Sequence, residues 1–93
     1  MTEAGLHRAC AALAGGRGAW LVKLLPSVTG LPDALLVSVE RIALVELKAP
    51  RGRLSPRQRA VFRRLWEDYG IEVHIVRTPA EFTKLLDALG EPQ

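Results

Sequence analysis

The run from Ile42 to Lys48 constrains the fold of this chain more than any other stretch. Its apolar residues are typical of a strand that is buried on both faces, as in a sheet covered by helices on each side. Glu46 and Lys48 interrupt the end of the run, and alternation along a strand places both on the same face. An ionised carboxylate is costly in such a position unless it meets a cation. We therefore interpret the end of this strand as a functional site.

The surrounding pattern predicts seven elements in the order α-β-β-β-α-β-α. Ser55 to Gln58 forms a capping box with proline at the first helical position, which is a strong helix start. The second and third strands are close enough along the chain for an antiparallel hairpin, whereas the helix between the third and fourth strands favours a parallel crossover. The expected helices are 3–14, 56–69 and one that opens at Thr78, the expected strands are 19–25, 34–39, 42–48 and 71–76, and 26–32 is an expected loop.

This order predicts an α/β (α+β) fold, a small mixed β-sheet flanked by helices with 42–48 as its central strand. A chain of 93 residues is expected to be one domain, 1–93, and its small size favours an oligomer. The single cysteine, Cys10, excludes an internal disulfide and is expected in the core. Since there is no signal-peptide pattern and no apolar run near the roughly 20 residues of a membrane span, we expect a soluble, cytoplasmic protein without membrane contact.

The positive charge of the chain is concentrated in one segment. Residues 47–66 contain no acidic residue, and a basic segment beside carboxylates indicates a polyanion partner whose phosphates meet arginines. On charge alone, a solvated helix face explains the segment equally well; the neighbouring carboxylates favour nucleic acid. The basic residues are Lys48, Arg51, Arg53, Arg57, Arg59, Arg63 and Arg64.

Asp33, Glu46 and Lys48 together suit metal-assisted phosphodiester hydrolysis. Mg²⁺ prefers oxygen ligands, commonly one or two carboxylates with waters and substrate phosphate, and a lysine beside the acids limits their mutual repulsion. The alternative is a buried Glu46–Lys48 ion pair with Asp33 as a turn residue after proline. The Glu46–Lys48 pair alone, or Asp33 alone, favours that alternative. The two together on adjacent strands favour a functional site. For the aromatic residues Trp20, Trp66 and Tyr69, core packing is the preferred interpretation.

Three short motifs resemble those of a known family. They are Gly30-Leu-Pro-Asp33, then Glu46-Leu-Lys48-Ala-Pro, then Gly52 with Leu54-Ser55-Pro56-Arg57-Gln58. In this order and spacing they resemble the VRR-NUC domain, the virus-type replication-repair nuclease branch of the PD-(D/E)XK superfamily. The resemblance implies the superfamily's core fold and a Mg²⁺- or Mn²⁺-dependent nuclease that acts on DNA by its structure more than its sequence. Standalone members of this size are similar to Holliday-junction resolvases in working as symmetric oligomers. Such members occur in phages, which implies that the protein is located in a bacterial or phage-infected host cell.

The resemblance also assigns roles to individual residues. Asp33 and Glu46 match the metal-binding acids, and Lys48 matches the catalytic lysine. The backbone carbonyl of Leu47 is implied as a further metal ligand. Gln58 matches the glutamine of the helix after the active-site strand, a role that is compatible with its place in the capping box because the residue lies on the inward stripe of that helix.

Two further matches are less tightly defined by motif. Glu3 matches the acid of the family's first helix, as a catalytic and metal-binding residue, although the helix macrodipole favours a glutamate there in any case. Lys23 matches a lysine often found before the loop that precedes the aspartate, and contact with phosphate or solvation of an edge strand would each explain it. For His7 a surface or capping role is preferred to a site role. The residues expected to bind DNA are Lys23, Arg51, Arg53, Arg57, Arg63 and Arg64.

The leading hypothesis from the sequence is a divalent-metal-dependent endonuclease for branched DNA, working as a homodimer or larger symmetric assembly. Two alternatives remain open. One is a non-catalytic DNA-binding module that keeps the nuclease fold, because fold resemblance alone does not establish activity. The other is a nuclease that is active only with a helicase or replication partner.

Overall fold

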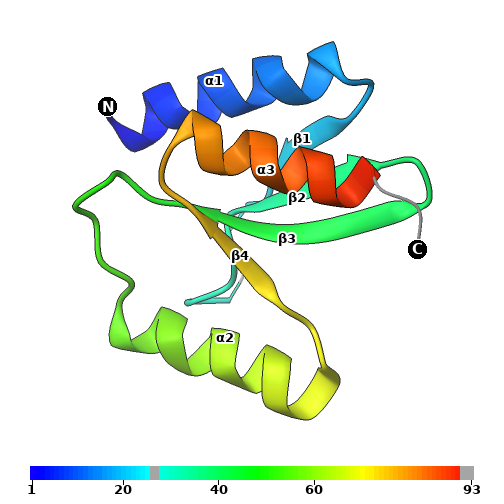
Figure 1. Ribbon diagram of the computed structural model, residues 1–93. Helices are drawn as coiled ribbons and strands as arrows, with labels where there is room; N and C mark the ends of the chain where they lie inside the picture. The colour runs from blue at the N-terminus through cyan, green and yellow to red at the C-terminus, as the bar shows by residue number, and fades with distance from the viewer. Residues whose placement is uncertain (26–27, 91–93) are drawn as a thin grey trace.

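The computed structural model describes residues 1–25 and 28–90 and contains a four-stranded sheet with helices on both faces. Helices α1 and α3 lie side by side on one face, and α2 lies on the other (Figure 1). Residues 26 and 27 of the expected loop 26–32 are outside the described residues. The elements are α1 (Glu3–Gly16), β1 (Trp20–Lys23), β2 (Ala34–Ser38), β3 (Arg41–Leu47), α2 (Pro56–Tyr69), β4 (Val73–Val76) and α3 (Pro79–Gly90).

The sheet has the mixed topology that the sequence predicts. The strand order is β1-β2-β3-β4, with β2 antiparallel to both β1 and β3, and β4 parallel to β3. The central position of β3 is therefore confirmed. The two edge strands are shorter than predicted. Pairing of β1 with β2 ends at Lys23, and pairing of β4 with β3 begins only at Val73, opposite Leu44.

The core lies between the sheet and the pair of helices α1 and α3. Alternation along β3 directs Ala43, Val45 and Leu47 into it, where they meet side chains such as Phe82 of α3. Cys10 lies in this core, as predicted, and burial raises the pKa of its thiol to about 11. No helix within the described part of the chain is long and apolar enough to cross a membrane.

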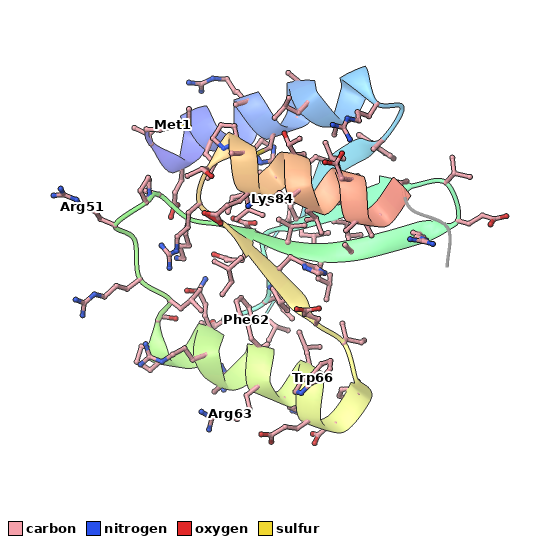
Figure 2. All side chains as sticks on the ribbon, in the orientation of Figure 1. Met1, Arg51, Phe62, Arg63, Trp66 and Lys84 are labelled. Atoms are coloured by element: carbon pink, nitrogen blue, oxygen red, sulfur yellow. The ribbon has the colours of Figure 1, made fainter. Side chains whose placement is uncertain are left out.

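The second face of the sheet is only partly covered, and here one prediction is wrong. Trp20, Trp66 and Tyr69 were expected in the core, but their exposed fractions are 66%, 61% and 63%. Helix α2 packs against β4 and contains no fully buried residue, because no second helix of residues 1–25 and 28–90 lies beside it on this face. Figure 2 shows Phe62 between α2 and the sheet and Trp66 at the margin of the helix. Trp20 lies in β1, at the edge of the sheet opposite β4.

The loop before β2 is anchored to the start of α2 through Gly30. This glycine has φ +93°, and a Cβ atom there would lie 2.9 Å from Cγ of Arg57 and 2.9 Å from Cγ2 of Val61. The contact is reinforced by Nε–H of Arg57, which donates to the backbone oxygen of Thr29 at 3.2 Å. The loop that leads to Asp33 and the helix that carries Gln58 are thereby held against each other.

We predict that Gly30→Ala destabilises the domain by about 3 kcal/mol or more, since left-handed strain and overpacking each cost about 1–3 kcal/mol. Gly70→Ala is the matched control, because Gly70 also has positive φ, +68°, but has no atom within 4 Å of the added Cβ. Urea unfolding monitored by circular dichroism measures both. Equal losses in the two variants would show that the close approach at Gly30 contributes nothing.

Candidate active site

Asp33 and Glu46 lie next to each other at one end of the sheet. The register of β2 and β3 pairs Ala34 with Val45, and its continuation by one residue places Asp33 opposite Glu46. Asp33 is held by two strands, because its Oδ1 accepts the backbone N–H of Leu47 at 3.2 Å and its backbone oxygen accepts the N–H of Leu24 at 2.7 Å. The two carboxylates are thus positioned by backbone pairing and not by flexible side chains alone.

Glu46 is the one charged residue within the buried set of the described chain, with 3% of its surface exposed. Its Oε2 accepts a hydrogen bond from Nε2–H of Gln58 at 3.0 Å and lies 3.5 Å from Nζ of Lys48. Its Oε1 is buried and has no hydrogen-bond partner among the described residues. A buried carboxylate oxygen without a donor is costly, and it is a ready ligand for a cation.

Lys48 lies between two glutamates. Its side chain is 15% exposed, and Nζ lies 3.5 Å from Glu46 and 4.0 Å from Oε1 of Glu3. Its backbone is also fixed, because its N–H donates to the oxygen of Val76 in β4 at 3.0 Å. Glu3 reaches this point from the first turn of α1, so the structure links the first helix to the ends of β3 and β4.

The surroundings of Asp33 and Glu46 make both acids harder to ionise. Burial is the main reason that the pKa of Glu46 is raised, and the negative charge of Asp33 raises it further, against the opposing effects of Lys48 and Gln58. Burial likewise raises the pKa of Asp33, while the hydrogen bond from Leu47 lowers it. Two acids that each disfavour the charge of the other are stabilised by a cation placed between them.

His7 is the site neighbour that sequence reasoning undervalued. It lies one helical turn after Glu3, is half-buried, and its charge acts to lower the pKa of Asp33, whereas Glu3 acts to raise it. The preferred surface or capping role therefore understates its proximity to the carboxylates. The signal was present in the spacing, since residues four apart share one face of a helix.

Comparisons with known proteins identify the family and agree with the fold. The profile described as the VRR-NUC domain matches residues 7–79. The chain belongs to the VRR-NUC domain family. A solved structure described as a VRR_NUC domain superposes with a TM-score of 0.74 and 23% sequence identity over 94% of this chain and 97% of that one, which shows the same fold. A comparison with curated proteins gave no match.

Within this VRR-NUC domain, the acids expected to hold a metal form a pair and not a larger cluster. No group of three or more His, Cys, Asp or Glu side chains in the described ranges is arranged as metal ligands. The carboxylate of Glu3 instead approaches Lys48, so its assignment as a metal ligand stays a prediction. The other predicted ligands, Asp33, Glu46 and the backbone carbonyl of Leu47, offer oxygen donors, the type that suits Mg²⁺ or Mn²⁺, and their assignment likewise stays a prediction.

The predicted DNA-binding residues of the VRR-NUC domain divide into separate groups. Arg51 and Arg53 are exposed on the loop directly after Lys48, and Arg51 projects away from the domain at its tip (Figure 2). Figure 2 shows Arg63 on the side of α2 that faces away from the sheet. Arg64 is also exposed and pairs with Asp68 at 3.5 Å. The loop arginines are therefore the predicted DNA-binding pair nearest in the chain to Lys48.

Two other predicted contacts have different surroundings. Nε of Arg57 is already engaged by Thr29, although the residue as a whole is exposed. Lys23 pairs with Ala34, so the pleat places it on the core face of the sheet and not on the face of Asp33 and Glu46. Lys23 is exposed at the edge strand, and its assignment to phosphate stays a prediction.

We predict that Glu46→Gln raises the stability of the metal-free protein by roughly 1–3 kcal/mol at pH 7, the range associated with a poorly satisfied buried polar group. The pKa of Glu46 is raised above its ordinary 4.5, so the folded state binds more protons than the unfolded chain as pH rises through this region. The wild type therefore loses stability there, and the variant does not.

Urea unfolding in EDTA between pH 4 and pH 8 measures this difference. The advantage of Glu46→Gln should grow as pH rises and shrink toward acid. Glu67→Gln, at an exposed position of α2, is the matched control and should show no such trend. A difference between Glu46→Gln and wild type that is independent of pH would contradict the argument.

Proposed function

We propose that this VRR-NUC domain is a Mg²⁺- or Mn²⁺-dependent DNA endonuclease that hydrolyses phosphodiester bonds in branched DNA, in the manner of a Holliday-junction resolvase. One observation carries the proposal: the buried carboxylate of Glu46 lies beside Asp33 and has one oxygen without a hydrogen-bond partner in the described chain. A purely structural Glu–Lys pair leaves that oxygen and the neighbouring acid unexplained.

The residues present fit a divalent cation. Asp33, Glu46 and the carbonyl of Leu47 would hold it, and the unpartnered Oε1 together with the raised pKa of both acids marks a place where a positive charge is stabilising. When bound, such an ion supplies a more acidic water and stabilisation of negative charge on the phosphate. Waters and the substrate phosphate would complete its shell.

The chain's own groups prepare the rest of the chemistry. Lys48 holds a positive charge 3.5 Å from Glu46, where its ammonium can orient an attacking water or contact the scissile phosphate. Gln58 donates to Glu46 and so keeps that carboxylate from rotating. The burial of Glu46 keeps bulk water from that carboxylate, which strengthens its electrostatic interactions.

The mode of DNA binding follows from the type of side chain available. The exposed arginines, led by Arg51 and Arg53, suit phosphate oxygens, which give affinity without reading the base sequence. A preference for DNA shape is therefore favoured over a preference for sequence.

A symmetric pair of subunits is supported by the apolar side chains on the open sheet face. Trp20, Val37 and Ile42 are cross-strand neighbours, and Trp20 and Ile42 are each 66% exposed. Exposed apolar patches of this kind mark protein interfaces. Two-fold pairing would present one site to each strand of a branched duplex.

The decisive experiment is incubation with labelled single-stranded, flap, splayed-arm and four-way-junction DNAs, with and without Mn²⁺. We expect metal-dependent cleavage with paired, symmetric nicks in the four-way junction. Glu46→Gln and Lys48→Met should lower cleavage by about a hundredfold or more, as loss of an electrostatic catalytic group does, while junction binding in a gel-shift assay is largely kept. Mn²⁺ should raise the Tm of wild type but not of Glu46→Gln.

The exposed variant Glu67→Gln serves again as the control and should cut like wild type. Equal cleavage by wild type, Glu46→Gln and Lys48→Met would refute the assignment of the chemistry. Junction binding with neither cleavage nor a Mn²⁺ effect on Tm would instead identify a non-catalytic DNA-binding module. Cleavage that appears only with an added helicase or replication protein would identify a partner-dependent nuclease.

We predict that Arg51→Gln and Arg53→Gln weaken binding to all DNA structures alike, because each arginine contacts phosphate and no base. The slope of log affinity against log salt concentration should fall by about 1 for each substitution. Arg17→Gln is the control, since Arg17 pairs with Asp87 near the opposite end of α1 from the site. Fluorescence anisotropy at a series of salt concentrations measures the slope, and an unchanged slope in the loop variants would exclude these contacts.

A further inference from the structure

Arg77 joins the end of β4 to the loop that follows Lys48. Its Nη1 donates to the backbone oxygen of Ala49 at 3.1 Å and to that of Gly52. The residue is half-buried, and it lies outside the three sequence motifs discussed above. Hydrogen bonds from a guanidinium are charge-assisted and stronger than those between neutral groups. This side chain therefore holds together segments that are more than twenty residues apart in the chain.

The segment that Arg77 holds is a tight turn immediately after the active-site lysine. The N–H of Gly52 donates to the oxygen of Ala49 at 2.8 Å, so Ala49 accepts from both Gly52 and Arg77. Lys48 lies against this turn, because its Cδ is 3.6 Å from the position that a Cβ on Gly52 would occupy. The turn therefore packs along the methylene chain of Lys48.

We infer that Arg77 is a positioning residue: by holding the Ala49–Gly52 turn, it aims the ammonium of Lys48 at Glu46 and presents Arg51 at the tip of the loop. The backbone of Lys48 is fixed separately by the oxygen of Val76, the residue before Arg77. A lysine side chain has four rotatable bonds, so a fixed backbone alone does not fix its nitrogen. The packed turn supplies the remaining constraint. The catalytic consequence rests on the proposed function, whereas the effect on the loop does not.

The chain offers a matched control for this role. Nη1 of Arg41 also donates to two backbone oxygens, those of Ala88 at 3.3 Å and Leu89 at 3.0 Å. Arg41 begins β3, so it lies at the opposite end of that strand from Glu46 and Lys48. Loss of Arg41 removes the same kind of interaction far from the site. Any effect that Arg77 variants show and Arg41→Gln does not show is therefore specific to the loop.

The test compares wild type, Arg77→Gln, Arg77→Lys and Arg41→Gln. Limited digestion of the native proteins with trypsin, followed by mass spectrometry, measures the cleavage rate after Arg51 and Arg53. We expect Arg77→Gln to raise this rate by about tenfold, because a locally opened loop is the state that is cut. Arg77→Lys keeps a positive donor without the guanidinium fork and should lie between Arg77→Gln and wild type. Arg41→Gln should leave the rate unchanged.

Steady-state cleavage of junction DNA supplies the second readout. We expect Arg77→Gln to lower kcat by between about ten- and a hundredfold, as misplacement of a catalytic group does, with a smaller change in KM and partial rescue in Arg77→Lys. Equal loop digestion in Arg77→Gln and Arg41→Gln, or a fall in kcat without faster loop digestion, would overturn the inference. Should Arg77→Gln not fold, Arg77→Lys decides by the same two measurements. If wild type cuts no DNA, the proposed function fails and the trypsin comparison alone still decides whether Arg77 holds the loop.

Discussion

The burial of the Glu46 carboxylate on the central strand is the constraint on which the rest of the structure depends. An acid in this place needs compensation, and the neighbouring elements each supply part of it: Lys48 from the end of β3, and Gln58 from α2. The compensation is incomplete, because Asp33 adds a second negative charge and Oε1 stays without a donor. A chain selected for stability alone would replace such an arrangement with apolar packing. Local loss of stability in exchange for a reactive geometry is characteristic of functional sites.

The fold brings five chain segments to one end of the sheet. Because β2 and β3 are antiparallel, the start of β2 meets the end of β3, and because β3 and β4 are parallel, both of their carboxyl ends lie there as well. The first turns of α1 and α2 reach the same place, through Glu3 and Gln58. Helix N-termini carry partial positive charge, which favours acidic side chains beside them. The site is thus a consequence of topology as much as of the individual side chains.

Much of this could be predicted from local pattern. The buried run of β3 with its alternating Glu46 and Lys48 indicated a sheet covered on both sides, and the capping box at Ser55 placed Gln58 on the inward face of α2, as the structure shows. These features depend on residues two to four positions apart, where strand and helix geometry are almost fixed. The exposure of Trp20 and Trp66 was not predictable in this way. An apolar stripe indicates a surface that packs against another element. It does not indicate whether the chain contains an element that buries that surface.

The sequence by itself determined the element order, the central strand, the family resemblance and the residues of the carboxylate–lysine motif. Each of these depends only on residue type and on spacing along the chain. Only the tertiary structure decided which distant groups meet them. It placed His7 near Asp33, turned Glu3 toward Lys48, and joined Arg77 to Ala49 and Gly52. Contacts between residues more than twenty positions apart depend on how the helices pack on the sheet and on which elements the loops contact. No local periodicity encodes that geometry, which is why the surroundings of Lys48 could be seen only in the folded molecule.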